Sequence, residues 1–257
     1  MHANLTVPLS TLLAFALVLA RISGAFAFVP PPVKDAGPSA ARVVLSLATT
    51  IALFPAWPYV DANNVSAGVL AGWVASEGAL GLAVGLTVSF LAEALTFGAQ
   101  VVGLQAGYGY VSIVDPTTQA ESDVLPVMAQ LLAGLLFFTT GLHRAVIATF
   151  AHSLAKFPPG VFVENRAMAQ TVVRLGGTLF SVGLRLAFPV IGLLLMAEIA
   201  LALVGRINSQ LHLSMHAFPM KIMISLLVLV SVLAVAPELY RSYAEQVFQV
   251  IQESILR

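Results

Sequence analysis

The fold class is decided by residues 69–114, which read VLAGWVASEGALGLAVGLTVSFLAEALTFGAQVVGLQAGYGYVSIV. This stretch contains only two charged side chains, Glu77 and Glu93. It is more than twice as long as the ~20 apolar residues that a helix needs to cross a bilayer. A helix of this length and composition has to face lipid or apolar protein along most of its surface. The sequence therefore predicts a membrane protein.

The composition of the whole chain leads to the same prediction. Of its 257 residues, 59% are hydrophobic and 9% are charged, and the mean hydropathy is +0.94. Soluble domains carry roughly 25% charged residues, which cover their surface. Basic and acidic residues are equal at 12 each, so no basic excess indicates nucleic acid as a partner. The absence of cysteine excludes disulfides and thiolate metal sites.

Six apolar stretches follow one another along the chain, separated by polar or proline-containing connections. They are Leu9–Val29, Ala40–Trp57, Val69–Val114, Val124–Leu154, Ala167–Val204 and Phe218–Tyr240. The third, fourth and fifth exceed one crossing, so we expect helices that are tilted, broken, re-entrant or partly buried in protein. We predict an all-α membrane protein with a single membrane-embedded domain over residues 1–257, of which residues 241–257 form a polar C-terminal tail.

The N-terminal stretch has two interpretations. Residues 9–20 and the Ala25-Phe26-Ala27 sequence have the order of a signal peptide and its cleavage site. The usual basic n-region is missing and Arg21 falls between the two parts, which favours a first membrane helix. Basic residues are balanced between alternate connections, so the positive-inside rule assigns no orientation.

A stripe of small residues between two glutamates is the strongest pattern of the third stretch. Its members recur every four positions and wind slowly along one side of a helix: Glu77, Gly81, Gly85, Ser89 and Glu93. Small residues at this spacing let a second helix backbone approach closely. We therefore assign helix packing to Gly81, Gly85, Ser89 and Gly103. The alternative is that the two glutamates meet a water-filled path or a cation of a partner.

Ionisable side chains inside the apolar stretches each cost roughly 2.5–3.5 kcal/mol on insertion scales. They are Arg21, Glu77, Glu93, Arg144, Arg185, Glu198 and Lys221. Their signs nearly balance, which predicts charge pairing between helices or across subunits. A proton relay is the alternative, and Arg185 and Glu198 are the deepest candidates.

A glycine-rich segment precedes the Asp115-Pro116 turn. Glycines at positions 103, 107 and 109 weaken the helix and free the backbone, so we expect a movable element here. The Ala106–Gly109 piece resembles a potassium filter only superficially, because the threonine is missing.

Signatures of catalysis are missing from the sequence. It contains no H-E-x-x-H, G-x-S-x-G or P-loop motif, so we expect neither an enzyme nor a cofactor. His212 and His216 are four residues apart but lack a third ligand, so we expect no metal site.

An ordered set of short motifs extends from about Leu12 to Tyr240. They are LARISG at 19–24, PSAAR at 38–42, GLAVG at 81–85, GLQAG at 103–107, VDP at 114–116, LLFF at 135–138, LAFPV at 186–190 and FPMKI at 218–222. In this order they resemble the FliR family and its injectisome counterpart SctT. Ala106 stands where the family commonly has methionine.

The resemblance implies a subunit of the type III protein export gate in the bacterial inner membrane, at the flagellar basal body. In this family FliR joins FliP and FliQ, with FlhB bound, in a hetero-oligomer of helical hairpins. Unfolded flagellar proteins pass through its channel during flagellum assembly, and other components supply the energy. The implied partners are these subunits, membrane lipid and unfolded export substrates, with no nucleic acid.

The resemblance also implies a plug that closes the channel at rest. It maps onto Gly107, Tyr108, Gly109, Val111, Ile113, Asp115 and Pro116. Two alternatives to a flagellar gate remain open at this point, an injectisome export gate and an ion or small-solute channel.

Overall fold

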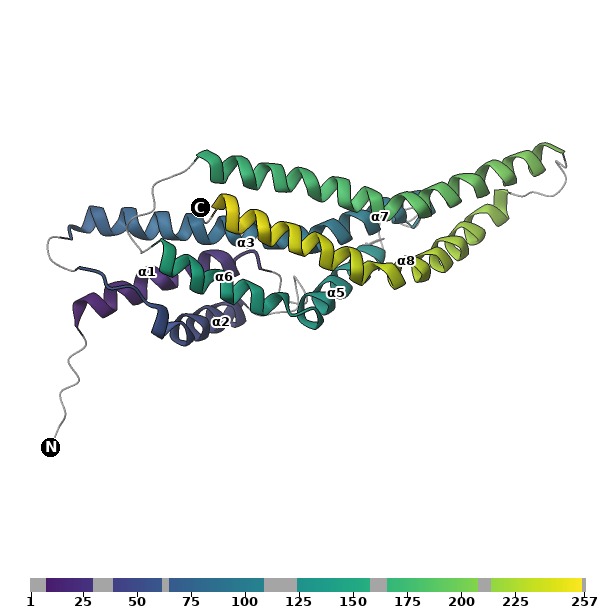
Figure 1. The fold of residues 1–257 in the computed structure, drawn as a ribbon. Helices are drawn as coiled ribbons and strands as arrows, with labels where there is room; N and C mark the ends of the chain where they lie inside the picture. Colours follow the sequence, from purple (N-terminus) through teal and green to yellow (C-terminus); the bar gives the residue numbers. More distant parts are fainter. Residues whose placement is uncertain are drawn as a thin grey trace, which may run out of the picture. The chain divides into compact units, whose positions relative to one another are not determined.

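The computed structural model describes residues 8–29, 39–61, 65–108, 124–157, 166–207 and 214–255. Within these ranges the chain forms helices and turns and no strand, which confirms the predicted all-α fold (Figure 1). The helices are α1 (Leu9–Phe26), α2 (Ser39–Ala52), the 3-10 helix η1 (Phe54–Ala56), α3 (Ala67–Ala106), α5 (Val124–Thr139), α6 (Leu142–Lys156), α7 (Arg166–Ile207), α8 (Ser214–Val250) and the π-helix η3 (Ile251–Ile255).

In the part of the chain that the structure describes, fewer helices qualify as membrane spans than there are predicted apolar stretches. Among the described residues, three helices are long and apolar enough to cross a membrane: α1, α3 and residues 168–207 of α7. Helices α5 and α6 together would form a fourth span, but they are bent by 63° relative to each other. The predicted stretch Val124–Leu154 is therefore broken. Gly141 stands at the break with φ 77°, a backbone conformation that side-chain-bearing residues rarely adopt.

Local sequence signals set the ends of two helices. Helix α2 ends at Ala52, and Pro55 lies in the 3-10 turn that follows. The Oγ of Ser66 accepts a hydrogen bond from the N–H of Val69 at 3.4 Å, which caps the first turn of α3.

The chain divides into two compact units, and α3, α5, α7 and α8 each contribute residues to both. Unit 1 contains Met1–Phe90, Phe137–Leu175 and Ala244–Arg257, and unit 2 contains Leu91–Leu136 and Gly176–Tyr243. The segment predicted as a polar C-terminal tail continues α8 and η3, and within unit 1 its side chains Ala244, Val247 and Ile251 are fully buried. The core of unit 2 is a cluster of Val102, Ala106, Leu125, Ala187, Val190 and Leu194.

In unit 1, α1 and α3 approach each other through glycines. A Cβ placed on Gly81 would lie 1.9 Å from the carbonyl oxygen of Arg21, and one on Gly85 would lie 2.3 Å from that of Ala25. The approach is reciprocal, since a Cβ on Gly24 would lie 2.6 Å from the carbonyl oxygen of Gly78. Such distances leave no room for a methyl group between the two backbones.

In unit 2, a second glycine contact joins α3 to α7. A Cβ on Gly98 would lie 2.8 Å from the carbonyl oxygen of Gly183, and one on Gly183 would lie 2.8 Å from that of Ala94. Small residues thus set the spacing of helices in both units, as expected where the hydrophobic effect does not drive helix association.

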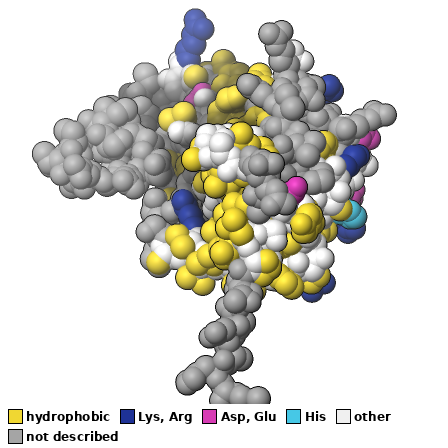
Figure 2. Space-filling model, turned by 90° about the vertical axis from the view of Figure 1, so that its left-hand side faces the viewer, with side chains coloured by type: hydrophobic (Ala, Val, Ile, Leu, Met, Phe, Trp, Pro, Cys, Tyr) yellow, Lys and Arg dark blue, Asp and Glu magenta, His cyan; other side chains and the backbone are white. Residues whose placement is uncertain are grey.

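Large apolar side chains are exposed on several helices. Leu135 of α5 is 60% exposed and Met196 of α7 is 68% exposed. In the space-filling view of Figure 2, hydrophobic side chains cover much of the described surface, with scattered charges. A surface of this kind needs lipid or apolar protein around it.

The glycine contact between α1 and α3 can be tested with two single-methyl substitutions on one helix. Gly81→Ala should lower the melting temperature of the full-length protein in detergent, because its Cβ meets backbone that has to shift, at a cost of about 1–3 kcal/mol. Gly78→Ala is the control. Its Cβ meets nothing within 4 Å, so its melting temperature should be unchanged or higher, since alanine favours helix by about 1 kcal/mol. Equal losses in the two variants would contradict the packing described.

Candidate functional site

The most buried charges among the described residues lie where α1 meets α3. Arg21 of α1 and Glu77 of α3 both have fully buried side chains, and Arg21 Nε donates a hydrogen bond to Glu77 Oε2 at 2.5 Å. Glu77 is one helical turn before Gly81, whose Cα lies against the Arg21 backbone. Helix α3 therefore contacts Arg21 at two places: Gly81 lies against its carbonyl group, and Glu77 binds its guanidinium.

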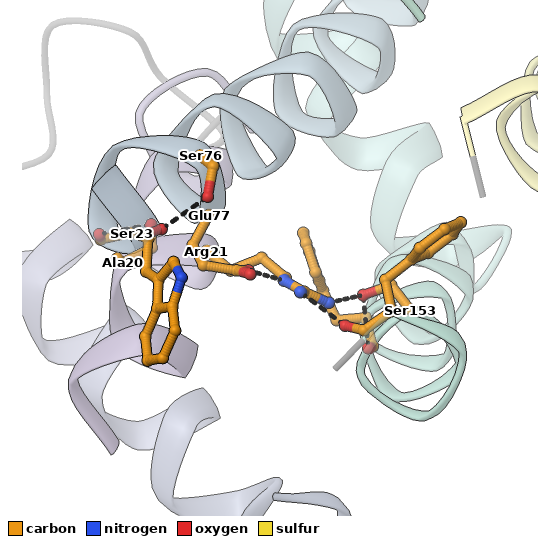
Figure 3. A network of polar contacts seen from close by, with 9 residues as sticks. Ala20, Arg21, Ser23, Ser76, Glu77 and Ser153 are labelled. Atoms are coloured by element: carbon orange, nitrogen blue, oxygen red, sulfur yellow. Dashed lines mark hydrogen bonds and ion pairs between the residues drawn. The ribbon is translucent and has the colours of Figure 1, made fainter. Parts of the chain in front are cut away.

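The remaining nitrogens of the guanidinium reach α6. Nη1 donates to Ser153 Oγ at 3.1 Å, and Nη2 donates to the carbonyl oxygen of Phe157 at 2.8 Å. Figure 3 shows the Arg21 side chain extending from α1 between Glu77 and Ser153. Phe157 is the C-cap residue of α6, where the helix dipole places partial negative charge. Arg21 thus connects α1, α3 and the C-terminal end of α6.

Ser153 completes this network. Its side chain is fully buried, and its Oγ donates to the carbonyl oxygen of Phe150 at 2.8 Å while it accepts from Arg21. A hydroxyl group can do both at once. Each of the three guanidinium nitrogens therefore has a partner, which a charge removed from water requires.

A second opposite-charge contact lies in unit 2. Lys221 Nζ of α8 donates to Glu198 Oε1 of α7, and the two side chains are 22% and 34% exposed. Because both are partly exposed, this pair contributes less to helix placement than the Arg21 network does.

The other ionisable residues predicted for charge pairing occupy different positions. Glu93 is half-buried, whereas Arg144 and Arg185 are exposed. The structure therefore brings together Arg21 with Glu77 and Lys221 with Glu198, and it leaves Arg144 and Arg185 at the surface of the described chain.

Two residues predicted for helix packing make looser contacts than Gly81 and Gly85. Ser89 is half-buried, and its Oγ donates to the carbonyl oxygen of Leu86 within the same helix at 2.8 Å. A Cβ on Gly103 would lie 3.8 Å from Leu125 Cδ1, an ordinary van der Waals distance. Neither position requires a small residue as strictly as Gly81 does.

The predicted plug begins at the end of α3. Gly107 has φ 88°. Its N–H donates to the carbonyl oxygen of Leu104 at 3.2 Å, and the N–H of Tyr108 donates to the carbonyl oxygen of Gly103 at 3.0 Å. These bonds form a Schellman cap, which ends a helix at a left-handed glycine. Within the predicted apolar stretch Val69–Val114, helix α3 therefore ends at Ala106.

Tyr108 is held in place beside the cap. It packs against the core cluster of unit 2, and its hydroxyl is buried without a hydrogen-bond partner among the described residues. Gly107 and Tyr108 are thus anchored at the start of the segment predicted as the plug. Its other predicted members lie outside the described residues: Gly109, Val111, Ile113, Asp115 and Pro116.

Metal-ligating side chains do not gather in the described part of the chain. No group of three or more His, Cys, Asp or Glu is placed there to hold a metal ion. His212 and the side chain of His216, the predicted pair at helical spacing, lie outside the described residues.

Several site residues were missed at the sequence level. Gly24, Gly98 and Gly183 make close backbone contacts, and Ser153 and Phe157 complete the Arg21 network. A small-residue signal was present for Gly98, since Ala94 precedes it by four positions on α3. The carbonyl oxygen of Phe157 has no signal in the sequence, because any residue supplies one.

Comparison with known proteins assigns the chain to a family. Residues 12–247 match the family described as bacterial export proteins, family 1. The chain belongs to this family. The matched region includes both ion pairs and the Schellman cap, and the predicted resemblance to the FliR family is confirmed.

The chain is also similar to curated proteins named for flagellar biosynthesis and for Yop translocation. The chain is 29% identical to flagellar biosynthetic protein FliR of Escherichia coli K12, covering 83% of this chain and 80% of the relative. It is 30% identical to FliR of Caulobacter vibrioides, covering 82% and 84%. It is 25% identical to Yop proteins translocation protein T of Yersinia pestis, covering 85% of each chain.

The Arg21 network can be tested by removing its charges singly and together. Arg21→Leu should destabilise the full-length protein by about 3–5 kcal/mol, because it leaves the Glu77 carboxylate buried without its partner. The double variant Arg21→Leu with Glu77→Leu should recover much of this loss, because it removes both buried charges. Thermal unfolding in detergent measures both effects. A double variant that is less stable than Arg21→Leu alone would contradict this account.

Proposed function

We propose that the protein is a subunit of the type III protein export gate of the bacterial flagellum. It assembles with FliP- and FliQ-like subunits, and with an FlhB-like protein, around a channel for unfolded flagellar proteins. The observation that carries the proposal is the family match over residues 12–247, together with relatives named FliR that align over most of their length.

The surface of the protein supports assembly with other membrane subunits. Large apolar side chains remain exposed along α5 and α7. In the most apolar segment of α7, 17% of the residues are buried within the protein. Lipid can cover only the ~30 Å of a helix that crosses the hydrocarbon core. Residues 168–207 of α7 form a helix of about 60 Å at 1.5 Å per residue, so neighbouring subunits cover part of it.

The flagellar branch is favoured over the injectisome. Of eight similar proteins, seven are named FliR, with identities of 21–30%, and one is the Yersinia translocation protein, with an identity of 25%. The proposed location is accordingly the inner membrane at the flagellar basal body. The protein acts there as a conduit and gate rather than as an enzyme.

The gate in this proposal is the segment that follows the Schellman cap. Gly107 and Tyr108 fix where the segment leaves α3, and the apolar side chains Val111 and Ile113 close the channel at rest. The Arg21 network and the glycine contacts hold the surrounding helices while the segment moves aside.

Assembly provides the first test. A tagged full-length chain, produced together with FliP- and FliQ-like proteins from the same cell, should be isolated with both in one complex of defined mass by native mass spectrometry. The same chain produced alone should show no selective ion conductance in bilayers. A stable homo-oligomer with selective conductance would favour the small-solute channel instead.

Membrane permeability provides the second test. Deletion of residues 110–121 keeps Gly107 and Tyr108, and so keeps the cap and its core contact. The assembled variant should make cells leaky to small solutes that wild-type membranes exclude, as measured by dye or ion uptake. Tyr108→Phe, which retains the ring, is the control, and membranes that contain it should be as impermeable to small solutes as wild-type membranes. Unchanged permeability in a correctly assembled deletion variant would rule out this segment as the plug.

A further inference from the structure

Arg185 is a charged residue near the middle of an apolar helix. It lies within residues 168–207 of α7, which qualify as a membrane span, and its side chain is exposed. Arg21 in α1, by contrast, has a partner for each guanidinium nitrogen inside the protein. An arginine facing hydrocarbon costs roughly 2.5–3.5 kcal/mol on insertion scales, so the surroundings of Arg185 have to supply an anion or water.

Arg185 points away from the core cluster formed by the described residues of unit 2. Gly183 and Ala187, two residues before and after it, are buried against the rest of the unit. At about 100° per residue, a separation of two residues places side chains on nearly opposite sides of a helix. Val190 and Leu194 continue the buried side. Arg185 therefore faces away from the core cluster of its own unit.

The residues around Arg185 form a continuous exposed face. We define the Arg185 face by its exposed members at helical spacing: Ser181, Arg185, Phe188, Gly192 and Met196. Phe188 is 61% exposed, and a Cβ on Gly192 would meet nothing within 4 Å. Ser181 and Gly192 leave space on either side of the arginine, which allows another helix backbone to approach closely.

The chemistry of this face selects its occupant. The planar guanidinium presents donors in a fork that matches a carboxylate, and such a charge-assisted pair is strongest where water is excluded. Exposed apolar side chains on the same face, Phe188 and Met196, require apolar contact beside that charge. A helix that carries one acidic residue among apolar ones satisfies both requirements.

We propose that the Arg185 face docks a helix of a neighbouring membrane subunit that places an aspartate or glutamate against Arg185. The inference deepens the proposed function by naming the surface and the chemistry of the partner, and it rests on that function for the choice of neighbours. Residues 168–207 exceed the thickness of the hydrocarbon core about twofold, which favours a protein helix over lipid tails as the cover.

Cross-linking in the native membrane locates the partner. A photoreactive residue at position 188 of the full-length chain, produced with the FliP- and FliQ-like proteins, should form an adduct with a protein helix. Mass spectrometry should map the adduct to within one turn of an aspartate or glutamate. An adduct with lipid only, or with a helix that lacks an acidic residue, overturns the inference. The proposed function survives that result if the chain is still isolated with both subunits.

Charge reversal tests the contact itself. Arg185→Glu should lower recovery of the complex about tenfold or more, as expected when one partner of a desolvated charge pair is changed. Changing the mapped acid of the partner to arginine should restore recovery to within about twofold. Lys156→Glu reverses an exposed charge at the end of α6, on another helix, and should leave recovery nearly unchanged.

Failure of the paired swap to restore the complex overturns the inference. If the Arg185→Glu variant does not accumulate in the membrane, the experiment uses Arg185→Gln instead, because glutamine is polar but uncharged. Normal recovery of the complex with Arg185→Gln also overturns the inference.

Discussion

A guanidinium that is closed off from water has to find all its hydrogen-bond acceptors inside the protein, and this requirement governs unit 1. Arg21 meets it with a carboxylate of α3, a hydroxyl of α6 and the last carbonyl group of α6. These acceptors come from segments far apart in the sequence, so the requirement is met only when all three helices are in place. Such a contact adds little net stability relative to apolar packing, whereas the loss of one partner leaves an uncompensated buried charge.

The close approach of α1 and α3 makes this network possible. With side chains larger than hydrogen at Gly81 and Gly85, the two backbones would separate and Glu77 would move away from Arg21. The same principle operates in unit 2 through Gly98 and Gly183. Small residues and buried charges therefore act together: the small residues set the distance between the helices, and the charges set their register.

The sequence predicted the all-α membrane fold because composition and the length of apolar stretches are properties of the chain itself. It also predicted the glycine stripe of α3, since a period of four is visible without a partner. It did not predict Ser153 or the carbonyl oxygen of Phe157 as ligands of Arg21, because those contacts depend on how α6 packs. The end of α3 at Ala106 was also missed, because Gly107 is compatible with both a bend and a stop.

The left-handed glycine at the end of α3 has a mechanical consequence. A Schellman cap fixes the direction in which the chain leaves the helix. Immediately after the cap, Tyr108 packs against the core cluster of unit 2. Tyr108 is therefore a fixed point at the end of α3, from which the chain continues. A tensile load on the chain after Tyr108 is passed into the backbone of α3, which the two glycine contacts brace against α1 in one unit and α7 in the other.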